Sequence, residues 1–444
     1  MAIAEQLAAT SDSDDRIAIW TDDQRISWSQ LAGVYRGKLK SLATWKNQRV
    51  GLALTSNANG IASLAALQDL RADVFLFDID TPEEQCRRWI DRFSLQALLL
   101  AEDRIQASTI VHDTAQSSGG SVTILTSGTT GEPKAVRHTW KGLTRPVRQT
   151  MTDDPQRWLL AFRPHLYAGL QVILQALANH QTLVVPTLSA EPNSVINLMV
   201  DAAVEYASAT PSFWRRLVMF ADSSAIKRVP LRQITLGGEV VDQSLLDRLH
   251  DLFPSARLAH IYATTEMGRC FAVSDGCAGF PISYLQAPTA DGVEMRLEAG
   301  ELWVRSANAM SGYENTTELT DDRNLHQGWF PTRDVVEVQG ERVFFVGRRS
   351  DMINVGGNKV YPVAVEKVIR QLVEVADVRV FGVPSSVAGQ LVACDVVPAA
   401  GVSPEQVRKN VMRVCQQQLD RYQCPRIVEI KRELDLNDAG KIAR

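Results

Sequence analysis

A nine-residue segment rich in hydroxyl groups and glycine is the clearest candidate for chemistry in this sequence. Residues 126–134 read Thr-Ser-Gly-Thr-Thr-Gly-Glu-Pro-Lys and follow an apolar strand expected at 122–125. Glycines let backbone N–H groups approach phosphate oxygens, hydroxyls add neutral donors, and a lysine supplies a point charge. The spacing is not that of a Walker A loop. The alternative is an ordinary surface turn, but the composition favours a phosphate loop formed by Thr126, Ser127, Gly128, Thr129, Thr130, Gly131 and Lys134.

This segment resembles the phosphate loop of the adenylate-forming superfamily, the AMP-binding enzymes. That superfamily includes acyl-CoA synthetases, adenylation domains of peptide synthetases and firefly luciferase. Further motifs follow in the family's order, so the resemblance covers about residues 26–441. It implies that Mg-ATP activates a carboxylic acid as an acyl-adenylate with release of pyrophosphate, and that a thiol then accepts the acyl group.

A Leu-Gly-Gly-Glu motif at 236–239 is expected to close a strand and to precede a helix. Two glycines at a strand end let a flat ring lie against the backbone. The resemblance implies that Gly238 and Glu239 contact the nucleotide and that Gly237 lines the acyl pocket.

The Tyr-Ala-Thr-Thr-Glu segment at 262–266 resembles the family's YGxTE motif. The resemblance implies that Tyr262 stacks on adenine, that Thr265 donates to the α-phosphate, and that Glu266 holds Mg²⁺. A carboxylate suits this hard cation. Ala263 replaces the usual glycine and is expected near the floor of the acyl pocket, which favours a small or medium acid.

The segment at 328–334, Gly-Trp-Phe-Pro-Thr-Arg-Asp, resembles GWxxTGD. The resemblance implies that Asp334 accepts hydrogen bonds from both ribose hydroxyls and that Arg348 also contacts the ribose. Arg333 stands where the family has glycine. Its side chain must therefore point away from the nucleotide, or the backbone must differ locally.

Three further positions are implied by the resemblance to act when the C-terminal part rotates between two half-reactions. Ser350 falls at the family's hinge, although relatives carry Asp or Lys there. Gly356 and Gly357 are expected to line the tunnel that admits the pantetheine chain. Lys441, near the end of the sequence, is expected to bridge the substrate carboxylate and the α-phosphate.

The segment at 163–170 sits where the family has an aromatic or histidine gate to the acyl pocket. His165 and Tyr167 are both candidates, and the sequence does not choose between them.

The elements that must position these motifs alternate between apolar strands and amphipathic helices. Strands are expected at 50–54 and 74–77 with a helix at 60–70 between them, and the alternation continues to about 262. Such units favour parallel sheets covered by helices on both faces. Short strands from 293 to 346 indicate a small β subdomain. We expect an α/β fold with a large N-terminal domain, 1–349, and a small mobile α+β C-terminal domain, 350–444, of helix–strand–strand–helix order.

The composition of the chain limits the classes of partner that we expect it to bind. The formal charge is −4, which provides no electrostatic case for a nucleic acid or a membrane surface. No apolar run approaches the roughly 20 residues that span a bilayer, and the N-terminus lacks the pattern of a secretory signal. Six scattered cysteines without a CxxC pair indicate a reducing, cytoplasmic location. A monomer or homodimer is expected.

The sequence leaves open which thiol accepts the acyl group. No carrier domain is recognisable in the sequence, so the thiol must come from another molecule. Coenzyme A is the first expectation, and the phosphopantetheine arm of an acyl carrier protein is the alternative. A degenerate nucleotide-binding protein without turnover is a further alternative, because Ala263, Arg333 and Ser350 depart from the family pattern.

Overall fold

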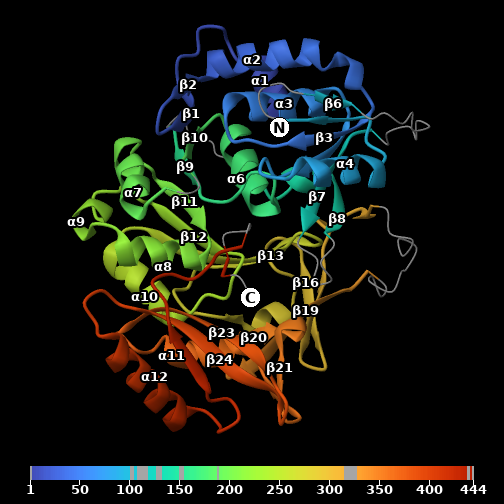
Figure 1. Cartoon of the computed structure of the whole chain (residues 1–444). Coiled ribbons are helices and arrows are strands. Elements are labelled where there is room, and N and C mark those ends of the chain that lie inside the picture. Colours follow the sequence, from blue (N-terminus) through green and yellow to red (C-terminus); the bar gives the residue numbers. More distant parts are fainter. Residues whose placement is uncertain are drawn as a thin grey trace.

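The computed structural model describes residues 3–100, 105–107, 119–126, 133–149, 155–187, 190–314, 328–437 and 441–442. Within them the chain forms four β-sheets (Figure 1). The first three sheets come from the part of the chain that precedes residue 349, and the fourth comes from the part drawn in orange and red at the bottom of Figure 1.

The first sheet is mostly parallel, with an antiparallel strand at each edge. Its spatial order is β14 (Gly268–Val273), β13 (Arg257–Thr264), β12 (Gln233–Gly237), β11 (Tyr206–Ala209), β9 (Arg157–Leu160), β10 (Thr182–Val185), β1 (Ile17–Thr21) and β2 (Arg25–Ser27).

The second sheet has four parallel strands at its centre. Its order is β18 (Gly312–Tyr313), β8 (Lys134–Thr139), β7 (Ser121–Thr126), β4 (Asp73–Phe77), β3 (Arg49–Ala53), β5 (Ala97–Leu99) and β6 (Ile105–Ala107).

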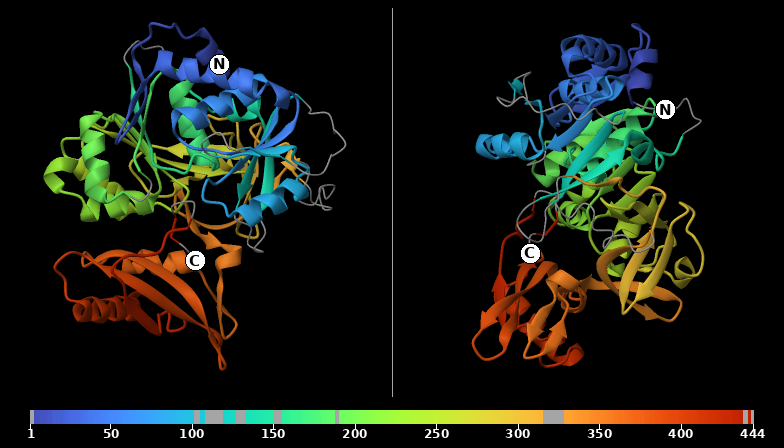
Figure 2. Two further views of the ribbon diagram at one scale, coloured as in Figure 1. Left: turned by 45° about the horizontal axis from the view of Figure 1, so that its top comes forward. Right: turned by 90° about the vertical axis from the view of Figure 1, so that its right-hand side faces the viewer.

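Helices cover both faces of these two sheets, as the alternating pattern predicted (Figure 2). Adjacent strand residues point to opposite faces, so Leu183 belongs to one buried cluster and Val184 to another. The cluster between the two sheets includes α1 (Ile3–Ala9), α2 (Trp28–Ser41), α3 (Ala58–Asp69) and α6 (Tyr167–Leu177). The outer face of the first sheet packs against α7 (Pro192–Asp201), α8 (Pro211–Phe220), α9 (Ser223–Ile226) and α10 (Gln243–Leu252). The outer face of the second sheet packs against α4 (Glu83–Arg92), and α5 (Trp140–Thr144) follows β8.

The third sheet is antiparallel and matches the predicted β subdomain. Its order is β15 (Phe280–Pro281), β20 (Arg342–Arg348), β19 (Phe330–Gln339), β17 (Glu301–Arg305) and β16 (Glu294–Glu298). Its core is continuous with β13 and β14 of the first sheet, because Phe271 and Phe280 share one buried cluster. The ends of β13, β19 and β20 are thereby brought together.

A short 3₁₀ turn, η5 (Arg349–Asp351), leads from the third sheet to the fourth. The fourth sheet contains β22 (Asn358–Val360), β21 (Ile353–Val355), β24 (Gly389–Pro398), β23 (Val375–Ser385) and β25 (Ile427–Ile430), with α11 (Pro362–Ile369) and α12 (Pro404–Gln418) packed against it. The predicted helix–strand–strand–helix order is correct but incomplete. It missed the β21–β22 hairpin and β25, because strands of three or four residues carry too little periodicity.

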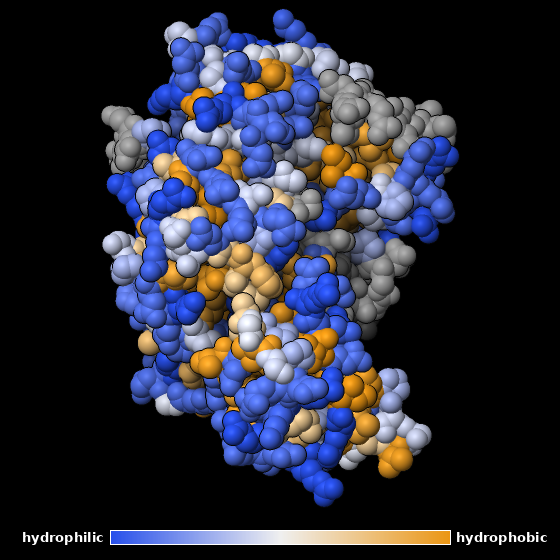
Figure 3. Space-filling model, turned by 60° about the vertical axis from the view of Figure 1, so that its left-hand side comes forward, coloured by the Kyte–Doolittle hydropathy of each residue, from blue (hydrophilic) through white to orange (hydrophobic). Residues whose placement is uncertain are grey.

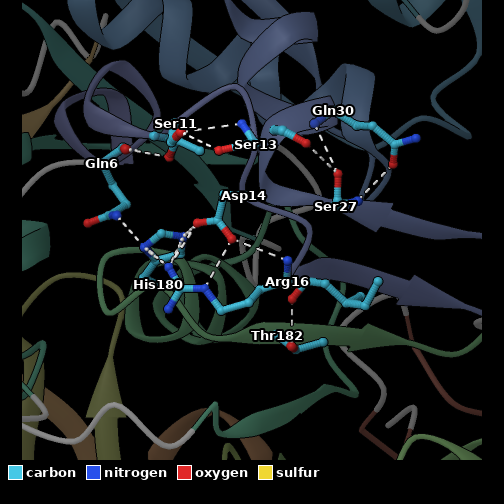
Figure 4. A network of polar contacts seen from close by, with 12 residues as sticks. Gln6, Ser11, Ser13, Asp14, Arg16, Ser27, Gln30, His180 and Thr182 are labelled. Atoms are coloured by element: carbon cyan, nitrogen blue, oxygen red, sulfur yellow. Dashed lines mark hydrogen bonds and ion pairs between the residues drawn. The ribbon is translucent and has the colours of Figure 1, made fainter.

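The N-terminal segment is tied to the turn between α6 and β10 by a polar network (Figure 4). Asp14 accepts from Arg16 at 2.8 Å and from Nε2 of His180 at 2.9 Å, and the Gln6 amide contacts Nδ1 of His180 at 2.8 Å. Burial lowers the pKa of His180 despite the neighbouring carboxylate. The imidazole is therefore neutral at pH 7 and donates to Asp14 through Nε2.

Hydrophilic side chains predominate on the face drawn in Figure 3, with hydrophobic ones interspersed among them. Within the described parts of the chain, no helix is both long and apolar enough to cross a bilayer.

Candidate active site

The predicted phosphate loop connects two antiparallel strands. Thr126 at the end of β7 pairs with Lys134 at the start of β8. The hydroxyl of Thr126 contacts the Lys134 carbonyl at 3.4 Å. Ser127, Gly128, Thr129, Thr130 and Gly131 lie outside the described residues. The structure therefore places the two ends of the loop, where β7 ends and β8 begins in the second sheet.

Lys134 and Glu266 are joined through Tyr313, which was not among the predicted site residues. The ammonium of Lys134 lies 5.3 Å from the ring centre of Tyr313, and the Tyr313 hydroxyl donates to Oε1 of Glu266 at 3.1 Å. Burial, reinforced by the Glu266 charge, raises the pKa of Tyr313, so the phenol remains protonated and donates. The signal was available, because Tyr313 ends a family-like Met-Ser-Gly-Tyr segment.

A buried histidine holds the backbone beside Glu266. Nε2 of His138 lies 2.7 Å from the carbonyl oxygen of Thr265. Burial lowers the pKa of His138 to about 4, so the neutral ring donates this hydrogen bond at pH 7. His138 was not among the predicted site residues. Its only signal was its position four residues after Lys134.

Tyr262, Asp334 and Arg348 form a compact group at the junction of the first and third sheets. The Tyr262 hydroxyl donates to Oδ2 of Asp334 at 2.5 Å, and Nε of Arg348 donates to Oδ1 at 3.0 Å. Asp334 is paired with Arg348 across β19 and β20 and is only 7% exposed. The register of β13 shifts between Tyr262 and Ala263, a bulge of the kind that re-aims side chains. The three predicted residues are therefore in direct contact.

Arg333 keeps the backbone conformation that glycine favours. Its φ is +62°, in the left-handed region, and its side chain is exposed. Its N–H donates to Oε1 of Glu301 at 2.9 Å. Its positive charge nevertheless reaches the site, because it lowers the pKa of Tyr313 against the larger effect of burial.

Lys441 lies against the predicted Leu-Gly-Gly-Glu motif. A Cβ built on Gly238 would stand 3.1 Å from Cε of Lys441 and 3.7 Å from its Nζ. Gly238 has a φ of +86°, so a side chain here would be strained as well as obstructive. Burial, with help from Arg348, lowers the pKa of Lys441, while Glu239 and Asp334 oppose that shift. Residues more than a hundred positions apart thus share one site.

Glu239 makes contacts that the sequence did not suggest. Its carboxylate accepts from the N–H and hydroxyl of Ser212 at 2.9 and 3.0 Å, and from the N–H of Ile442 at 3.1 Å. Gly237, the preceding glycine, pairs with Ile261 of β13.

The two gate candidates lie in different surroundings. Nε2 of His165 is 3.7 Å from Oδ2 of Asp78, a carboxylate that also pairs with Arg163. Tyr167 begins α6, and its ring centre is 5.9 Å from that of His138. A Cβ at Gly268 would be 3.0 Å from the Tyr167 hydroxyl, so this side chain reaches the strand that follows Glu266. Tyr167 is thus the candidate beside the nucleotide motifs.

The remaining predicted residues lie in the C-terminal part. Gly356 and Gly357 form the β21–β22 turn with φ of +59° and +88°, and a Cβ at either would meet open space. Ser350 lies in η5, where its hydroxyl donates to Asp351 at 2.8 Å. In this arrangement Lys441, from the C-terminal tail, is the group at Gly238.

Among the described residues, no group of three or more His, Cys, Asp and Glu could hold a metal ion. A single carboxylate such as Glu266 nevertheless fits Mg²⁺, which is commonly held by one or two carboxylates together with substrate phosphates and water.

This geometry and the comparisons with known proteins agree. The family model described as AMP-binding enzyme matches residues 111–314, and the model of the AMP-binding enzyme C-terminal domain matches 364–441. The chain belongs to this family, as its motifs predicted.

Curated relatives of this chain are named as ligases that join a carboxylic acid to coenzyme A. The indoleacetate–CoA ligase of Aromatoleum aromaticum is 27% identical over 412 residues, 86% of this chain and 76% of that protein. The 2-succinylbenzoate–CoA ligase of Bacillus pumilus is 28% identical over 340 residues, 72% of this chain and 66% of that protein. These relatives confirm the predicted class, an AMP-forming acid–thiol ligase.

The fold class is confirmed by a solved structure of an anthranilate CoA ligase in complex with anthranoyl-AMP. It superposes with a TM-score of 0.80 at 17% identity and covers 100% of this chain and 95% of that one.

Proposed function

We propose that this chain activates a small or medium carboxylic acid as its adenylate and then transfers the acyl group to coenzyme A. The observation that carries this proposal is the position of Lys441, which lies at Gly238 beside the Tyr262–Asp334–Arg348 group. The negative charges of Glu239 and Asp334 attract the ammonium of Lys441 to the place where two anions must be brought together.

Asp334 and Arg348 would hold the ribose. Each carboxylate oxygen of Asp334 already accepts one hydrogen bond and has a second lone pair. The two oxygens can therefore also accept hydrogen bonds from the two ribose hydroxyls. Arg348 and Tyr262 therefore orient the carboxylate of Asp334 before the ribose binds. Tyr262 would also offer its ring to adenine, and Gly238 would let the base lie close to the backbone.

Adenylation would place the acid beside the α-phosphate. A carboxylate oxygen attacks the α-phosphorus, the bond to the bridging oxygen breaks, and pyrophosphate leaves. Lys441 neutralises the two anions, and Thr265 donates to the α-phosphate. Because burial lowers the pKa of Lys441, arriving anions would strengthen its protonated form. The segment 126–134 would hold the β- and γ-phosphates.

Glu266 would hold Mg²⁺, which supplies charge neutralisation to the phosphates when bound. The hydrogen bond from Tyr313 orients the Glu266 carboxylate for that task. The hydrogen bond from His138 to the Thr265 carbonyl holds the backbone next to it.

Thioester formation would follow a rotation of residues 350–444 relative to residues 1–349. The single turn η5, which contains Ser350, joins the third sheet to the fourth and supports a hinge there. Rotation would withdraw Lys441 and bring up Gly356 and Gly357. The open space around both glycines suits the close approach of a pantetheine chain. The thiol would attack the acyl carbon and AMP would leave.

The acyl pocket is proposed to include Gly237 and Ala263, with Tyr167 favoured over His165 as the gate. Tyr167 supports this because it lies against Gly268 and His138, close to the Glu266 motif. A cytoplasmic location is also proposed, supported by six unpaired cysteines.

ATP–pyrophosphate exchange with purified protein, Mg²⁺ and a panel of carboxylic acids tests the proposal. Exchange that depends on one class of acid is expected, with the highest rates for small or medium acids. Coenzyme A and a phosphopantetheinylated carrier protein are then offered separately as acceptors. Consumption of the adenylate by the carrier alone would overturn the choice of coenzyme A, and no exchange with any acid would overturn the activation step.

A further inference from the structure

We propose that Glu239 is a positioning residue that fastens the C-terminal tail to helix α8 and thereby places Lys441 for adenylation. The proposal rests on the function proposed above for Lys441. It assigns Glu239 a role in place of the nucleotide contact that the sequence motif implied. We call Glu239, Ser212 and Ile442 the tail latch.

One side of the tail latch is the N-terminus of α8. Ser212 is the second residue of this ten-residue helix, and its N–H is among those that a helix leaves without an internal partner. Oε2 of Glu239 accepts from that N–H at 2.9 Å, and Oε1 accepts from the Ser212 hydroxyl at 3.0 Å. A negative charge at a helix N-terminus is also favoured by the helix dipole. Glu239 is therefore held rigidly without any help from the tail.

The other side is a small clasp at the end of the described chain. The side-chain oxygen of Asn437 accepts from the N–H of Lys441 at 3.1 Å, and the backbone N–H of Asn437 donates to the Lys441 carbonyl at 2.8 Å. Leu436 and Ile442 form an antiparallel bridge across this loop. These contacts join residues 436–437 to residues 441–442, and none of them reaches the rest of the molecule.

Attachment is provided by the N–H of Ile442, which donates to Oε1 of Glu239 at 3.1 Å, together with the buried side chain of Ile442. This N–H directly follows Lys441 in the chain. Holding it fixes the backbone of Lys441, whose side chain then reaches Gly238. Arg370 of the C-terminal part adds a weaker attraction, because the charge of Glu239 is among those that raise its pKa.

The tail latch can open readily. When the tail leaves, Glu239 keeps both bonds from Ser212 and exchanges only the Ile442 N–H for water. No carboxylate is left buried without a partner, which would be expensive. The contribution of Glu239 to the difference between the two positions of the tail is then one amide-to-carboxylate hydrogen bond, enough to shift the docking equilibrium by about tenfold.

The two half-reactions provide the test. Glu239→Ala should slow acid-dependent ATP–pyrophosphate exchange about tenfold, while thioester formation from supplied acyl-AMP should be unchanged or faster. Glu239→Gln, which keeps an acceptor oxygen, should lie between Glu239→Ala and the natural protein. Equal loss of both half-reactions would overturn the proposal, since damage to α8 or to a nucleotide contact would impair both.

Ile442 tests the contact from the other side. Ile442→Pro removes the N–H, whereas the matched variant Ile442→Ala shortens the side chain and keeps it. Ile442→Pro should reduce adenylation more than Ile442→Ala does. If Glu239 acts through this N–H, the double variant Glu239→Ala with Ile442→Pro should be no slower than Ile442→Pro alone. Additive losses would overturn the proposal.

A conformational measurement separates this proposal from the proposed enzymatic function. Fluorophores for energy transfer are attached at the exposed positions Arg248 in α10 and Lys409 in α12, after replacement of the exposed Cys277 by serine. Without substrates, Glu239→Ala should reduce the docked population about tenfold relative to the undocked one. An unchanged population would overturn the tail latch. This readout is independent of turnover and stands even if no acid supports exchange.

Discussion

The hydroxyl of Tyr313 donates a hydrogen bond of 3.1 Å to the carboxylate of Glu266, and the ring of the same tyrosine lies beneath the ammonium of Lys134. One side chain thus connects the end of the phosphate loop with the proposed ligand of Mg²⁺. The connection exists because β18, which carries Tyr313, pairs with β8, which begins at Lys134.

Tyr313→Phe should weaken adenylation and its dependence on Mg²⁺ together. The substitution removes one hydrogen bond to a carboxylate, worth roughly 1.5 kcal/mol or about tenfold in rate. ATP–pyrophosphate exchange should fall by about that factor at low Mg²⁺, with a higher Mg²⁺ concentration at half-maximal rate.

Tyr284→Phe is the matched control, because the Tyr284 hydroxyl contacts the Ala272 carbonyl of β14 at 3.4 Å and not the Glu266 carboxylate. It should leave the Mg²⁺ dependence unchanged. A Tyr313→Phe variant with the natural Mg²⁺ dependence would show that the hydrogen bond does not orient Glu266.

Lys441→Ala should abolish adenylation and largely spare thioester formation from synthetic acyl-AMP. The ammonium is proposed to act only while the acid and ATP are held together. Each half-reaction is measured separately. Lys431→Ala is the control, since that lysine is exposed and pairs only with Glu429 at 2.7 Å among the described residues. Comparable loss of both half-reactions in Lys441→Ala would contradict the separation of the two steps.

Arg333→Gly should stabilise the protein by about 0.5–1 kcal/mol. A non-glycine residue in the left-handed region costs about 1–2 kcal/mol, part of which is offset by the greater freedom of glycine in the unfolded chain. The φ of +62° at Arg333 places it in that region. Urea unfolding measures the difference. Arg333→Ala keeps the strain and should show no gain, and a loss of stability in Arg333→Gly would mean that the arginine side chain makes a stabilising contact.

Protonation of His138 should destabilise the folded protein in mild acid. Its folded pKa is about 4, below the ordinary value of 6.5, so the unfolded chain binds a proton first as the pH falls. The contribution is fully present above pH 6.5 and is lost between pH 6.5 and 4, at about 1.4 kcal/mol per pH unit.

Urea unfolding at pH 7.5 and pH 5 measures this loss, which should reach about 2 kcal/mol at pH 5. His180 and His260 also have lowered pKa values and add to the slope, so the comparison must be with His138→Gln. Glutamine can still donate to the Thr265 carbonyl. This variant should lose less stability than the natural protein over the same interval, and an identical loss would contradict the assignment to His138.

Much of the fold was predictable because its signals are local. Apolar runs with strand or helical spacing placed β3, α3 and β4 to within a residue or two. The short strands β18 and β25 were missed, because they show no clear periodic pattern of apolar residues.

The site was predictable in its residues but not in its contacts. Tyr262, Asp334 and Arg348 were identified by motif, but their mutual hydrogen bonds arise where two sheets share one core. The same reasoning could not separate His165 from Tyr167, which are two residues apart in sequence, because what packs against each of them depends on the tertiary structure.

By itself the sequence determined the α/β fold class, the family and the positions of the motifs, because residue type and short-range spacing are written directly in the chain. Only the tertiary structure decided that Tyr313 reaches Glu266, that His138 holds Thr265, and that Glu239 meets Ile442, 203 positions away. Such contacts depend on how sheets and helices pack, and packing is a property of the whole chain that no local pattern encodes.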